Sequence, residues 1–299
     1  MSPIKRKKVL ITGAAGGMGR ACARLLGMTH DLVLGDVAAA PLEAFAAELE
    51  RDSYTVVGHA AGDTCDDGVL AALAGFLTPG EPFVLIHTAG VSPSLADWET
   101  IMRVNLQGTA KIMEALEPLV VPGTAAVLIA STAGHGLPSI PDLEAAMADA
   151  LSPELVARTA PFITGIAAQA GAGMEPGISY SFSKLGVLKL GERKAMDWGP
   201  KGGRVVTISP GLMLTPMGKK ELENTRGARE VLNAAPVGRP GTAMDIAVVA
   251  KFLASDEAAF ISGSDVRVDG GALSALQIPK ALSLGEWRGA EGGEAHLQF

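Results

Sequence analysis

Short apolar runs alternate along most of the chain with longer segments in which polar and apolar residues are mixed. The runs are rich in Val, Leu and Ile, which is typical of strands that are buried on both faces of a sheet. Because the runs are too short for buried helices, we expect a strand at each of them. They lie at Val9–Thr12, Leu32–Asp36, Thr55–Val57, Phe83–Ile86, Ala125–Ala130, Arg204–Ile208 and Asp265–Val268.

The mixed segments between these runs carry apolar residues at the spacing of an amphipathic helix. In the segment from Leu42 to Arg51, for example, Leu42, Phe45 and Leu49 share one side. We expect further helices at about 17–28, 69–77, 98–119, 180–198 and 244–253. Alternating strands and helices predict an α/β fold, in which right-handed crossovers place helices on both faces of a doubly wound parallel sheet of about seven strands.

Residues 136–177 break this rhythm with an alanine-rich segment that several prolines interrupt. We expect one helix over about 142–151 and a second that begins at Ser152-Pro153, because Ser caps helices and Pro suits their first position. Pro161 is expected to bend or break the second helix. The segment is interpreted as a helical insertion in a single domain of residues 1–299. An extension over about 274–299 follows, with Trp287 and Phe299 as candidate anchors.

Composition narrows the class of protein. Of the 299 residues 48% are apolar, and the net charge of -7 disfavours a general polyanion binder, so we expect no nucleic-acid partner. No apolar run is long enough to span a bilayer, and glycines interrupt the apolar stretch after the basic run at 5–8, which disfavours a signal peptide. Neither the two cysteines nor the five histidines have metal-ligand spacing, so we expect no metal and a cytoplasmic location.

A glycine-rich loop, Thr12-Gly13-Ala14-Ala15-Gly16-Gly17-Met18-Gly19, lies between the first expected strand and its helix. Such a loop lets the backbone approach a pyrophosphate, whose negative charge the helix N-terminus attracts. Asp36 closes the second strand, where a carboxylate can accept hydrogen bonds from the adenosine ribose and repel an added phosphate. With no basic residue at 14–17, the pattern favours NAD over NADP, with a helix-capping role for Asp36 as the alternative.

Tyr180 and Lys184 are four residues apart in an expected helix, so their side chains share one face. A nearby positive charge favours the phenolate and lowers the pKa of a tyrosine. The pair can therefore work as an acid/base unit, although such a pair is also common on ordinary helix surfaces.

With further markers in a fixed order, these residues resemble the short-chain dehydrogenase/reductase family, in its single-domain branch with a Rossmann-type fold, over about residues 8–273. The catalytic markers are Asn105, Ser131, Tyr180 and Lys184. The closing motif is Asp269-Gly270-Gly271. The cofactor-binding markers are Thr12, Gly13, Gly17, Met18, Gly19, Asp36, Asp63, Thr64, Ala89, Gly90, Tyr180, Lys184, Pro210, Gly211 and Thr215.

The resemblance implies a role for each catalytic marker. Tyr180 exchanges a proton with the substrate oxygen, and Lys184 lowers the pKa of Tyr180 and bonds the nicotinamide ribose. Ser131 holds the substrate oxygen, and Asn105 positions a water that leads from Lys184 to solvent. His87 and Thr88 depart from the family pattern, which has asparagines there; we interpret His87 as structural, with a catalytic role as the minority alternative.

A second departure is the gap of 49 positions between Ser131 and Tyr180, which is longer than the family's usual spacing. Bacterial hydroxysteroid dehydrogenase-like members carry extra helices at this place, so that subgroup is the nearest resemblance. The insertion either closes over the substrate cleft as a lid or covers the helix face that the family uses for assembly. We favour partial covering of the cleft and a homodimer over the family's common tetramer.

We therefore expect an NAD-dependent oxidoreductase that interconverts a hydrophobic secondary alcohol, hydroxysteroid-like or aryl, and its ketone. Apolar residues near the expected mouth of the site support such a substrate, among them Leu137, Ile140, Met174, Leu212, Met213, Leu214 and Met217. Two alternatives remain open. A nucleotide-sensing homologue would need no acid/base set, and an epimerase or dehydratase is disfavoured by the glycine spacing and the lack of a second domain.

Overall fold

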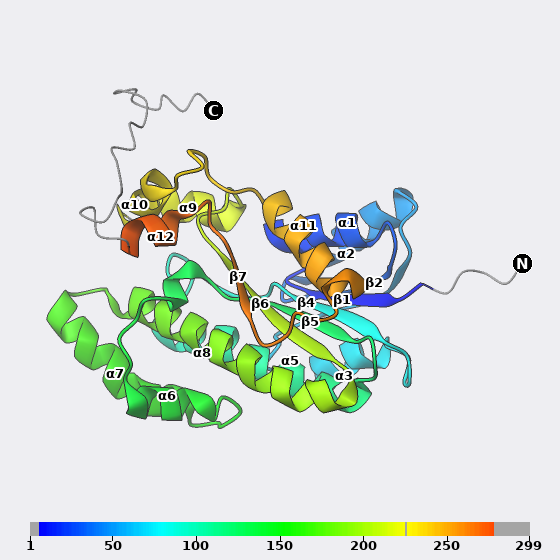
Figure 1. Cartoon of the computed structure of the whole chain (residues 1–299), viewed down its shortest axis with the longest axis horizontal. Helices are drawn as coiled ribbons and strands as arrows, with labels where there is room; N and C mark the ends of the chain where they lie inside the picture. The colour runs from blue at the N-terminus through cyan, green and yellow to red at the C-terminus, as the bar shows by residue number, and fades with distance from the viewer. Residues whose placement is uncertain (1–5, 225, 278–299) are drawn as a thin grey trace, which may run out of the picture.

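The structure is a computed structural model that describes residues 6–224 and 226–277. Its described strands form one parallel seven-stranded sheet in the order β3-β2-β1-β4-β5-β6-β7 (Figure 1). The strands are β1 (Lys8–Thr12), β2 (Asp31–Asp36), β3 (Val56–Ala61), β4 (Phe83–His87), β5 (Ala125–Ile129), β6 (Arg204–Pro210) and β7 (Asp265–Val268). The predicted doubly wound α/β fold is confirmed, although β3 lies mostly beyond the three residues expected for it.

Helices cover both faces of the sheet, as the alternation predicted (Figure 1). One layer contains α1 (Gly17–Leu26), α2 (Ala39–Arg51) and α11 (Ala243–Ala254), and the other contains α3 (Asp67–Gly75), α5 (Gly108–Leu116) and α8 (Glu175–Trp198). Side chains of a strand alternate between the two faces. In β1, Val9 and Ile11 therefore enter the core under α1 and α2, whereas Leu10 enters the core on the α8 side. All three are fully buried, which explains the continuous apolar runs in the sequence.

The sheet order places a crevice at the carboxyl end of β1. The chain runs outward from β1 to β3 and then returns to β4 on the other side of β1. The loops that follow β1 and β4 therefore diverge, and ligands of such sheets bind where the strand order reverses.

The helix expected over 98–119 is helical throughout but changes type along its length. It consists of α4 (Trp98–Met102), a π-helical turn η1 (Arg103–Gln107), α5 and a 3₁₀ turn η2 (Glu117–Leu119). Single π turns often occur at functional sites. This one contains the buried Asn105, whose carbonyl accepts a hydrogen bond from Thr109 Oγ1 at 2.6 Å.

The insertion is a helical pair, as predicted, with shifted boundaries. Its helices are α6 (Pro141–Ala148) and α7 (Leu155–Ala170), followed by α8 from Glu175. The expected start at Ser152-Pro153 is wrong, because Glu154 is the N-cap residue and the Ser152 hydroxyl accepts from its amide instead. Of the bend or break expected at Pro161, the break is wrong, since α7 continues through this residue, and the bend stays a prediction.

The insertion packs on the outer side of α8 and η1, at the lower left of Figure 1. Leu143, Met147, Leu155 and Ile163 are buried in the same apolar core as residues of α5 and α8. Gln107 of η1 also donates a hydrogen bond to the Ser152 carbonyl at 2.8 Å. Of the two arrangements that the sequence left open, the structure therefore shows the one on the helix face, and the partial covering of the cleft that we favoured is not observed.

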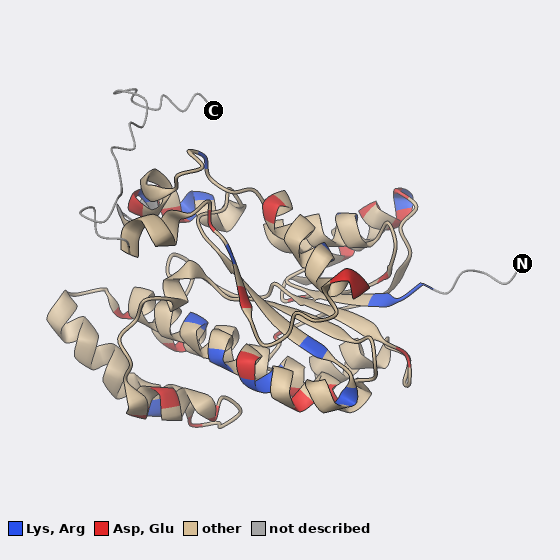
Figure 2. Ribbon diagram, in the orientation of Figure 1, with Lys and Arg blue, Asp and Glu red and all other residues tan. Residues whose placement is uncertain are grey.

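Three helices that the sequence did not predict gather at one end of the sheet (Figure 1). They are α9 (Pro216–Asn224), α10 (Arg226–Ala234) and α12 (Ala272–Gln277). The expected anchors Trp287 and Phe299 lie outside the described residues. None of the helices described could cross a membrane, by length and hydropathy together. Acidic and basic residues are interspersed over both helical layers in Figure 2.

We predict that Leu155→Ala destabilises the protein because it leaves a cavity where the insertion meets the core. Leu155 is fully buried, and the loss of such a leucine typically costs about 2–5 kcal/mol. Leu151→Ala is the matched control, because Leu151 is 43% exposed. Denaturant unfolding measures both. Equal, small changes in the free energy of unfolding would show that the insertion is not part of the core.

Candidate active site

The glycine-rich loop makes a tight turn between β1 and α1. Gly13 has a φ of 66°, and a Cβ on Gly19 would lie 2.1 Å from the Gly13 carbonyl oxygen. The first turn of α1 therefore packs on the loop at a distance that no larger residue permits. This arrangement leaves the N-terminus of α1 pointing at the crevice, where it can hold a phosphate.

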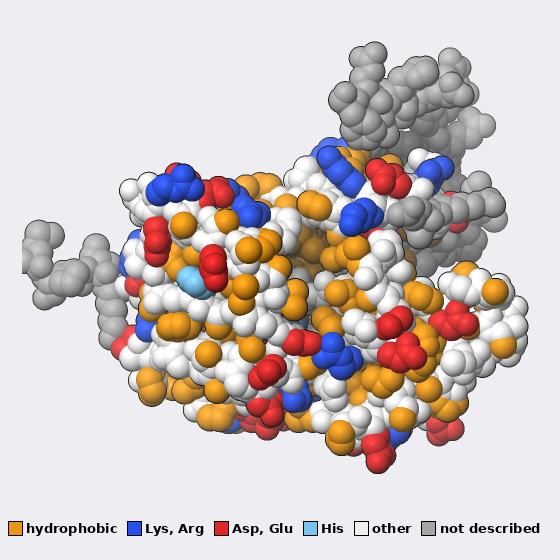
Figure 3. All heavy atoms as spheres, turned by 180° about the vertical axis from the view of Figure 1, so that it is seen from behind, with side chains coloured by type: hydrophobic (Ala, Val, Ile, Leu, Met, Phe, Trp, Pro, Cys, Tyr) orange, Lys and Arg blue, Asp and Glu red, His pale blue; other side chains and the backbone are white. Residues whose placement is uncertain are grey.

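A cavity of about 690 Å³ fills the crevice beside this turn. Figure 3 shows the rear face of the molecule, which is hollowed between two masses of atoms. Most of the cofactor markers expected from the sequence line this cavity: Gly13, Gly17, Met18, Gly19, Asp36, Asp63, Thr64, Ala89, Gly90 and Thr215. Thr12 is buried below the turn. Pro210 and Gly211 line a second cavity, described below.

Asp36 lies at the carboxyl end of β2 and faces the same cavity. Its two carboxylate oxygens accept hydrogen bonds from the Ala15 and Ala38 amides at 2.9 and 3.1 Å. The carboxylate thus ties the glycine-rich loop to the start of α2 as well as placing a negative charge in the crevice. The cavity also has a basic residue that the sequence argument did not weigh, Arg20, which pairs with Glu48 at 3.3 Å.

Asp63 follows β3 and is fixed on two sides. It accepts from the Cys65 amide at 2.8 Å and pairs with Arg103 at 2.6 Å. Burial opposes ionisation, but these two partners outweigh it and hold the pKa of Asp63 below its usual value. The side chain is therefore a fixed hydrogen-bond acceptor at the wall of the cavity.

The predicted catalytic residues meet at a smaller cavity of about 70 Å³ beyond the glycine-rich loop. Ser131, Tyr180 and Lys184 all line it, with Pro210 and Gly211 at the end of β6. Tyr180 and Lys184 lie side by side on α8, with the Lys184 Nζ 5.8 Å from the centre of the tyrosine ring. Lys184 Nζ also donates to the Ile129 carbonyl at 2.9 Å, which holds the ammonium under β5.

The expectation that Lys184 lowers the pKa of Tyr180 is not met in this structure. Burial raises the pKa of Tyr180 to about 12, the charge of Glu221 adds to the rise, and a hydrogen bond with Ser131 opposes it. Burial also lowers the pKa of Lys184 to about 8, with Glu221 opposing. Desolvation is therefore the largest influence on both pKa values, because both groups are removed from water in one narrow cavity.

Ser131 reaches Tyr180 because the chain turns sharply after β5. Ser131 caps the short 3₁₀ helix η3 (Thr132–Gly134), and its hydroxyl accepts from the Ala133 amide at 3.1 Å. Gly134 permits the approach of this turn to α8, since a Cβ there would lie 2.7 Å from the Leu185 nitrogen. Because Gly134 has no side chain, the end of β5 and helix α8 lie close enough for the Ser131–Tyr180 hydrogen bond.

Asn105 does not line the cavity but connects its walls. Its side chain exchanges hydrogen bonds with the backbone of Val91, at 2.8 and 3.0 Å, and donates to Ser183 at 3.2 Å. These contacts join the loop after β4 to the catalytic helix. Gly90 lies between Asn105 and Lys184, because a Cβ there would lie 3.1 Å from the Asn105 Oδ1 and 3.6 Å from the Lys184 Nζ. The water route expected at Asn105 stays a prediction.

His87 has a structural setting, in agreement with our interpretation of the sequence. It is buried between Thr12 Oγ1, 2.7 Å from Nδ1, and Thr109 Oγ1, 2.9 Å from Nε2. Thr109 donates its own proton to the Asn105 carbonyl, so it must accept from the His87 Nε2–H. Nδ1 is then the acceptor for Thr12. Burial, with the charge of Lys184, lowers the pKa of His87 to about 3, so the ring is neutral.

Glu221, like Arg20, is a residue of this site that the sequence did not reveal. It lies on α9 and lines the same cavity as Ser131 and Tyr180. The Pro at the start of α9 is a helix signal that could have located the helix. No sequence pattern points to Glu221 itself, because its place depends on how the segment after β6 returns over the cavity.

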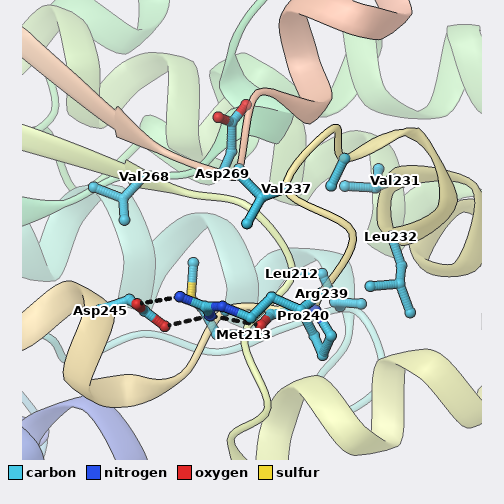
Figure 4. A pocket seen from close by; sticks show the side chains of 13 residues that line it. Leu212, Met213, Val231, Leu232, Val237, Arg239, Pro240, Asp245, Val268 and Asp269 are labelled. Carbon is cyan, nitrogen blue, oxygen red and sulfur yellow. Dashed lines mark hydrogen bonds and ion pairs between the residues drawn. The ribbon is translucent and has the colours of Figure 1, made fainter. Parts of the chain in front are cut away.

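A third cavity, of about 120 Å³, lies behind this segment and is shown in Figure 4. Val231, Leu232 and Val237 line it, and Arg239 donates to both carboxylate oxygens of Asp245 at 2.8 and 2.9 Å. Met213 lines both this cavity and the catalytic one. The Met213 side chain is therefore part of the wall between them.

Over the described part of the chain, no three His, Cys, Asp or Glu side chains form a group that could hold a metal ion. Tyr180, Lys184 and Ser131 are groups that can exchange or stabilise a proton, and they lie beside a crevice whose glycine-rich loop and helix N-terminus can hold a phosphate.

Comparison with known proteins agrees with this geometry. Residues 7–141 match the family model described as short chain dehydrogenase, and residues 144–272 match the model described as enoyl-(acyl carrier protein) reductase. A short-chain dehydrogenase/reductase of Alternaria brassicicola is 30% identical over 90% of this chain and 97% of its own length. The chain therefore belongs to the short-chain dehydrogenase/reductase family of oxidoreductases, whose members bind NAD or NADP.

Two further relatives illustrate the range of the family. D-threitol dehydrogenase of Mycolicibacterium smegmatis is 31% identical, over 89% of this chain and 92% of the relative. A solved 3-oxoacyl-[acyl-carrier protein] reductase of Brucella melitensis, with bound NAD, is 25% identical with a TM-score of 0.65, over 90% of this chain and 91% of that one.

We predict that His87 makes stability depend on pH. Its pKa is about 3 in the folded protein and near the ordinary 6.5 when unfolded, so below about pH 6.5 protons bind to the unfolded chain first. The contribution of the neutral His87 to the free energy of unfolding is fully present above about pH 6.5. It falls by up to about 1.4 kcal/mol per pH unit as the pH drops towards 3.

Urea unfolding between about pH 4 and 7 measures this slope. His87→Gln should flatten it, whereas His59→Gln, at an exposed position, should leave it as in the wild type. A wild-type slope in His87→Gln would show that His87 is not the group responsible.

Proposed function

We propose that this protein is an NAD-dependent dehydrogenase or reductase that interconverts a hydrophobic secondary alcohol and its ketone. The observation that carries the proposal is the convergence of Tyr180, Lys184 and Ser131 on one cavity that adjoins the dinucleotide crevice. A nucleotide sensor would have no use for such a set. The match to the dehydrogenase models over most of the chain supports the same conclusion.

Tyr180, Ser131 and Lys184 have different roles in the proposed reaction. The Tyr180 hydroxyl donates a proton to the ketone oxygen in reduction and accepts it in oxidation. The Ser131 hydroxyl, which already bonds to Tyr180, can hold the same substrate oxygen. The Lys184 ammonium, held by the Ile129 carbonyl, stabilises a developing phenolate. When bound, the nicotinamide supplies or accepts the hydride and, in its oxidised form, brings a positive charge.

Preference for NAD is supported by the place of Asp36. Its carboxylate faces the crevice at the end of β2, where it would accept from ribose hydroxyls and repel an added phosphate. Arg20 lines the same crevice and could attract a phosphate, but its guanidinium is paired with Glu48 and lies 4.3 Å from the centre of the Phe45 ring. Glu48 also pairs with Arg24, so the proposed preference rests on the place of the Asp36 carboxylate and on the partners that hold Arg20.

A largely apolar substrate is supported by the lining of the catalytic cavity, which includes Met18, Val91, Met213 and Met217. An aryl or hydroxysteroid-like alcohol would bury its ring system against such side chains. The cavity of about 70 Å³ is smaller than such a ring system, so the ring system would lie partly outside it.

We also propose a homo-oligomer, with a dimer favoured. Met244, Val248 and Phe252 follow one another at four-residue spacing on α11, and each is between 45% and 50% exposed. Phe260, which follows the 3₁₀ turn η5 (Asp256–Ala258) in contact with α11, is fully exposed as well. These side chains give this region of the protein an exposed apolar surface. A second copy of this chain would remove that surface from water.

We predict that Tyr180→Phe reduces turnover by about 10²–10⁴-fold, the usual value of one general acid/base group. NAD binding, measured by calorimetry, should stay nearly unchanged because the ring still packs. The chain has only two tyrosines, and Tyr54→Phe is the matched control. Near-normal turnover of a ketone by purified Tyr180→Phe would contradict the assigned role.

We predict that Asp36→Ala shifts kcat/KM from NAD towards NADP by about tenfold or more, or about 1.4 kcal/mol, because it removes the charge that repels the phosphate. Asp31→Ala, at the other end of β2, should leave the preference unchanged. Equal use of both cofactors by the wild type, or an unchanged ratio in Asp36→Ala, would refute the assignment.

A further inference from the structure

Two charged side chains are among the residues that line the catalytic cavity: Lys184, which belongs to the catalytic set, and Glu221. Glu221 comes from α9, which also contributes Met217 and Gly218 to the lining of the cavity. The other lining side chains near it are mainly apolar, among them Val91, Met213 and Met217. A carboxylate in such a wall is costly unless polar groups satisfy it.

The structure anchors Glu221 through the loop that follows β4. Its carboxylate makes a hydrogen bond with the Ser92 hydroxyl, and Ser92 lies 3.0 Å from Ser94 between their Oγ atoms. Ser92 is fully buried. The carboxylate is thus held between two walls of the cavity and does not simply lie on an exposed helix surface.

The charge of Glu221 acts on the reacting groups. Burial raises the pKa of Glu221, while Ser92 and the charge of Lys184 oppose the rise. Glu221 in turn raises the pKa values of both Tyr180 and Lys184. It therefore lies within electrostatic reach of the place where the substrate oxygen must be, since Tyr180 and Ser131 bind that oxygen in the proposed function.

We propose that Glu221 is a specificity-determining residue, which accepts a hydrogen bond from a hydroxyl or ammonium group on the carbon next to the reacting carbinol carbon and repels anionic substrates. This inference rests on the proposed function and adds to it a polar recognition point. The preferred substrate is then an apolar alcohol with a neighbouring hydrogen-bond donor, that is a vicinal diol or an amino alcohol. A carboxylate is acceptor-only, so it selects for donors.

Tyr180 and Ser131 engage the reacting oxygen, so they are not available to a second polar group of the substrate. Glu221 is the remaining lining side chain with strong acceptor oxygens. A substrate whose neighbouring carbon bears a carboxylate would bring two like charges together in a cavity with little water, which is strongly unfavourable.

Four alcohols with the same phenyl carbinol core test the proposal. In methylphenylcarbinol, styrene glycol and phenylethanolamine the neighbouring carbon carries only hydrogen, a hydroxyl or an ammonium in turn, and in mandelate that carbon is itself the carboxylate carbon. We expect the wild type with NAD to prefer the glycol and the amino alcohol to methylphenylcarbinol by about 10–100-fold in kcat/KM, and to use mandelate least. This factor corresponds to one hydrogen bond with a charged group.

Glu221→Gln keeps the shape but removes the charge. It should reduce the preference for the amino alcohol by about tenfold or more and improve the use of mandelate relative to methylphenylcarbinol. Glu221→Leu should also abolish the preference for the glycol. Glu223→Gln is the matched control, since Glu223 is an exposed carboxylate on the same helix and should leave all four ratios unchanged.

A binding measurement keeps this test separate from the test of the proposed function. Each alcohol is titrated calorimetrically into the protein saturated with NADH, which cannot oxidise an alcohol, so affinity is measured without turnover. If the wild type oxidises the alcohols but the ratios are the same in Glu221→Gln, the inference is wrong and the dehydrogenase assignment stands. If no alcohol is oxidised, the assignment fails by itself. In that case the calorimetric affinities decide on the inference. Equal affinities of the wild type for the glycol and for methylphenylcarbinol overturn it as well.

Discussion

The close approach of the turn after β5 to helix α8 is the contact on which the active site depends. Ser131 comes from the sheet and Tyr180 from a helix that begins after the long insertion, so no local interaction brings them together. Gly134 lets the backbone of the turn lie directly on α8. A methyl group at this position would push the strand and the helix apart and stretch the Ser131–Tyr180 hydrogen bond, although every residue of the proposed catalytic set would still be present.

A second set of contacts fixes the opposite wall. The π turn that contains Asn105 redirects its side chain to Val91 and Ser183, while its carbonyl receives the Thr109 hydroxyl. Thr109 is joined in turn to His87 and Thr12. The end of β1, the end of β4 and the helix α5 are therefore held by one hydrogen-bonded chain that is buried and fully paired, the condition under which polar networks rigidify a core. The proton transfer that we propose at the adjoining cavity would benefit from this rigidity, because it is sensitive to distance.

The sheet and most of the site could be predicted from the sequence because they follow local rules. Strands buried on both faces are continuous apolar runs, and Tyr180 and Lys184 share a face because they are one helical turn apart. Other features depend on tertiary contacts that leave no periodic signal. The pKa of Tyr180 is set by burial, the π turn at Asn105 interrupts a pattern that looks uniformly helical, and Glu221 enters the cavity only through the return path of the chain after β6. Pro161 is a further example of what local rules miss. A proline inside a helix usually breaks or kinks it, yet α7 continues through Pro161.

The insertion gives the catalytic helix a partner within its own chain. The side chains of α6 and α7 bury the outer face of α8, and they are connected to it covalently through a short link. The free energy that α8 gains from this contact is therefore independent of protein concentration, in contrast to contacts between subunits, which weaken on dilution by mass action. The contact with α6 and α7 therefore stabilises the positions of Tyr180 and Lys184 at any protein concentration. An assembly of several copies can still form through other surfaces.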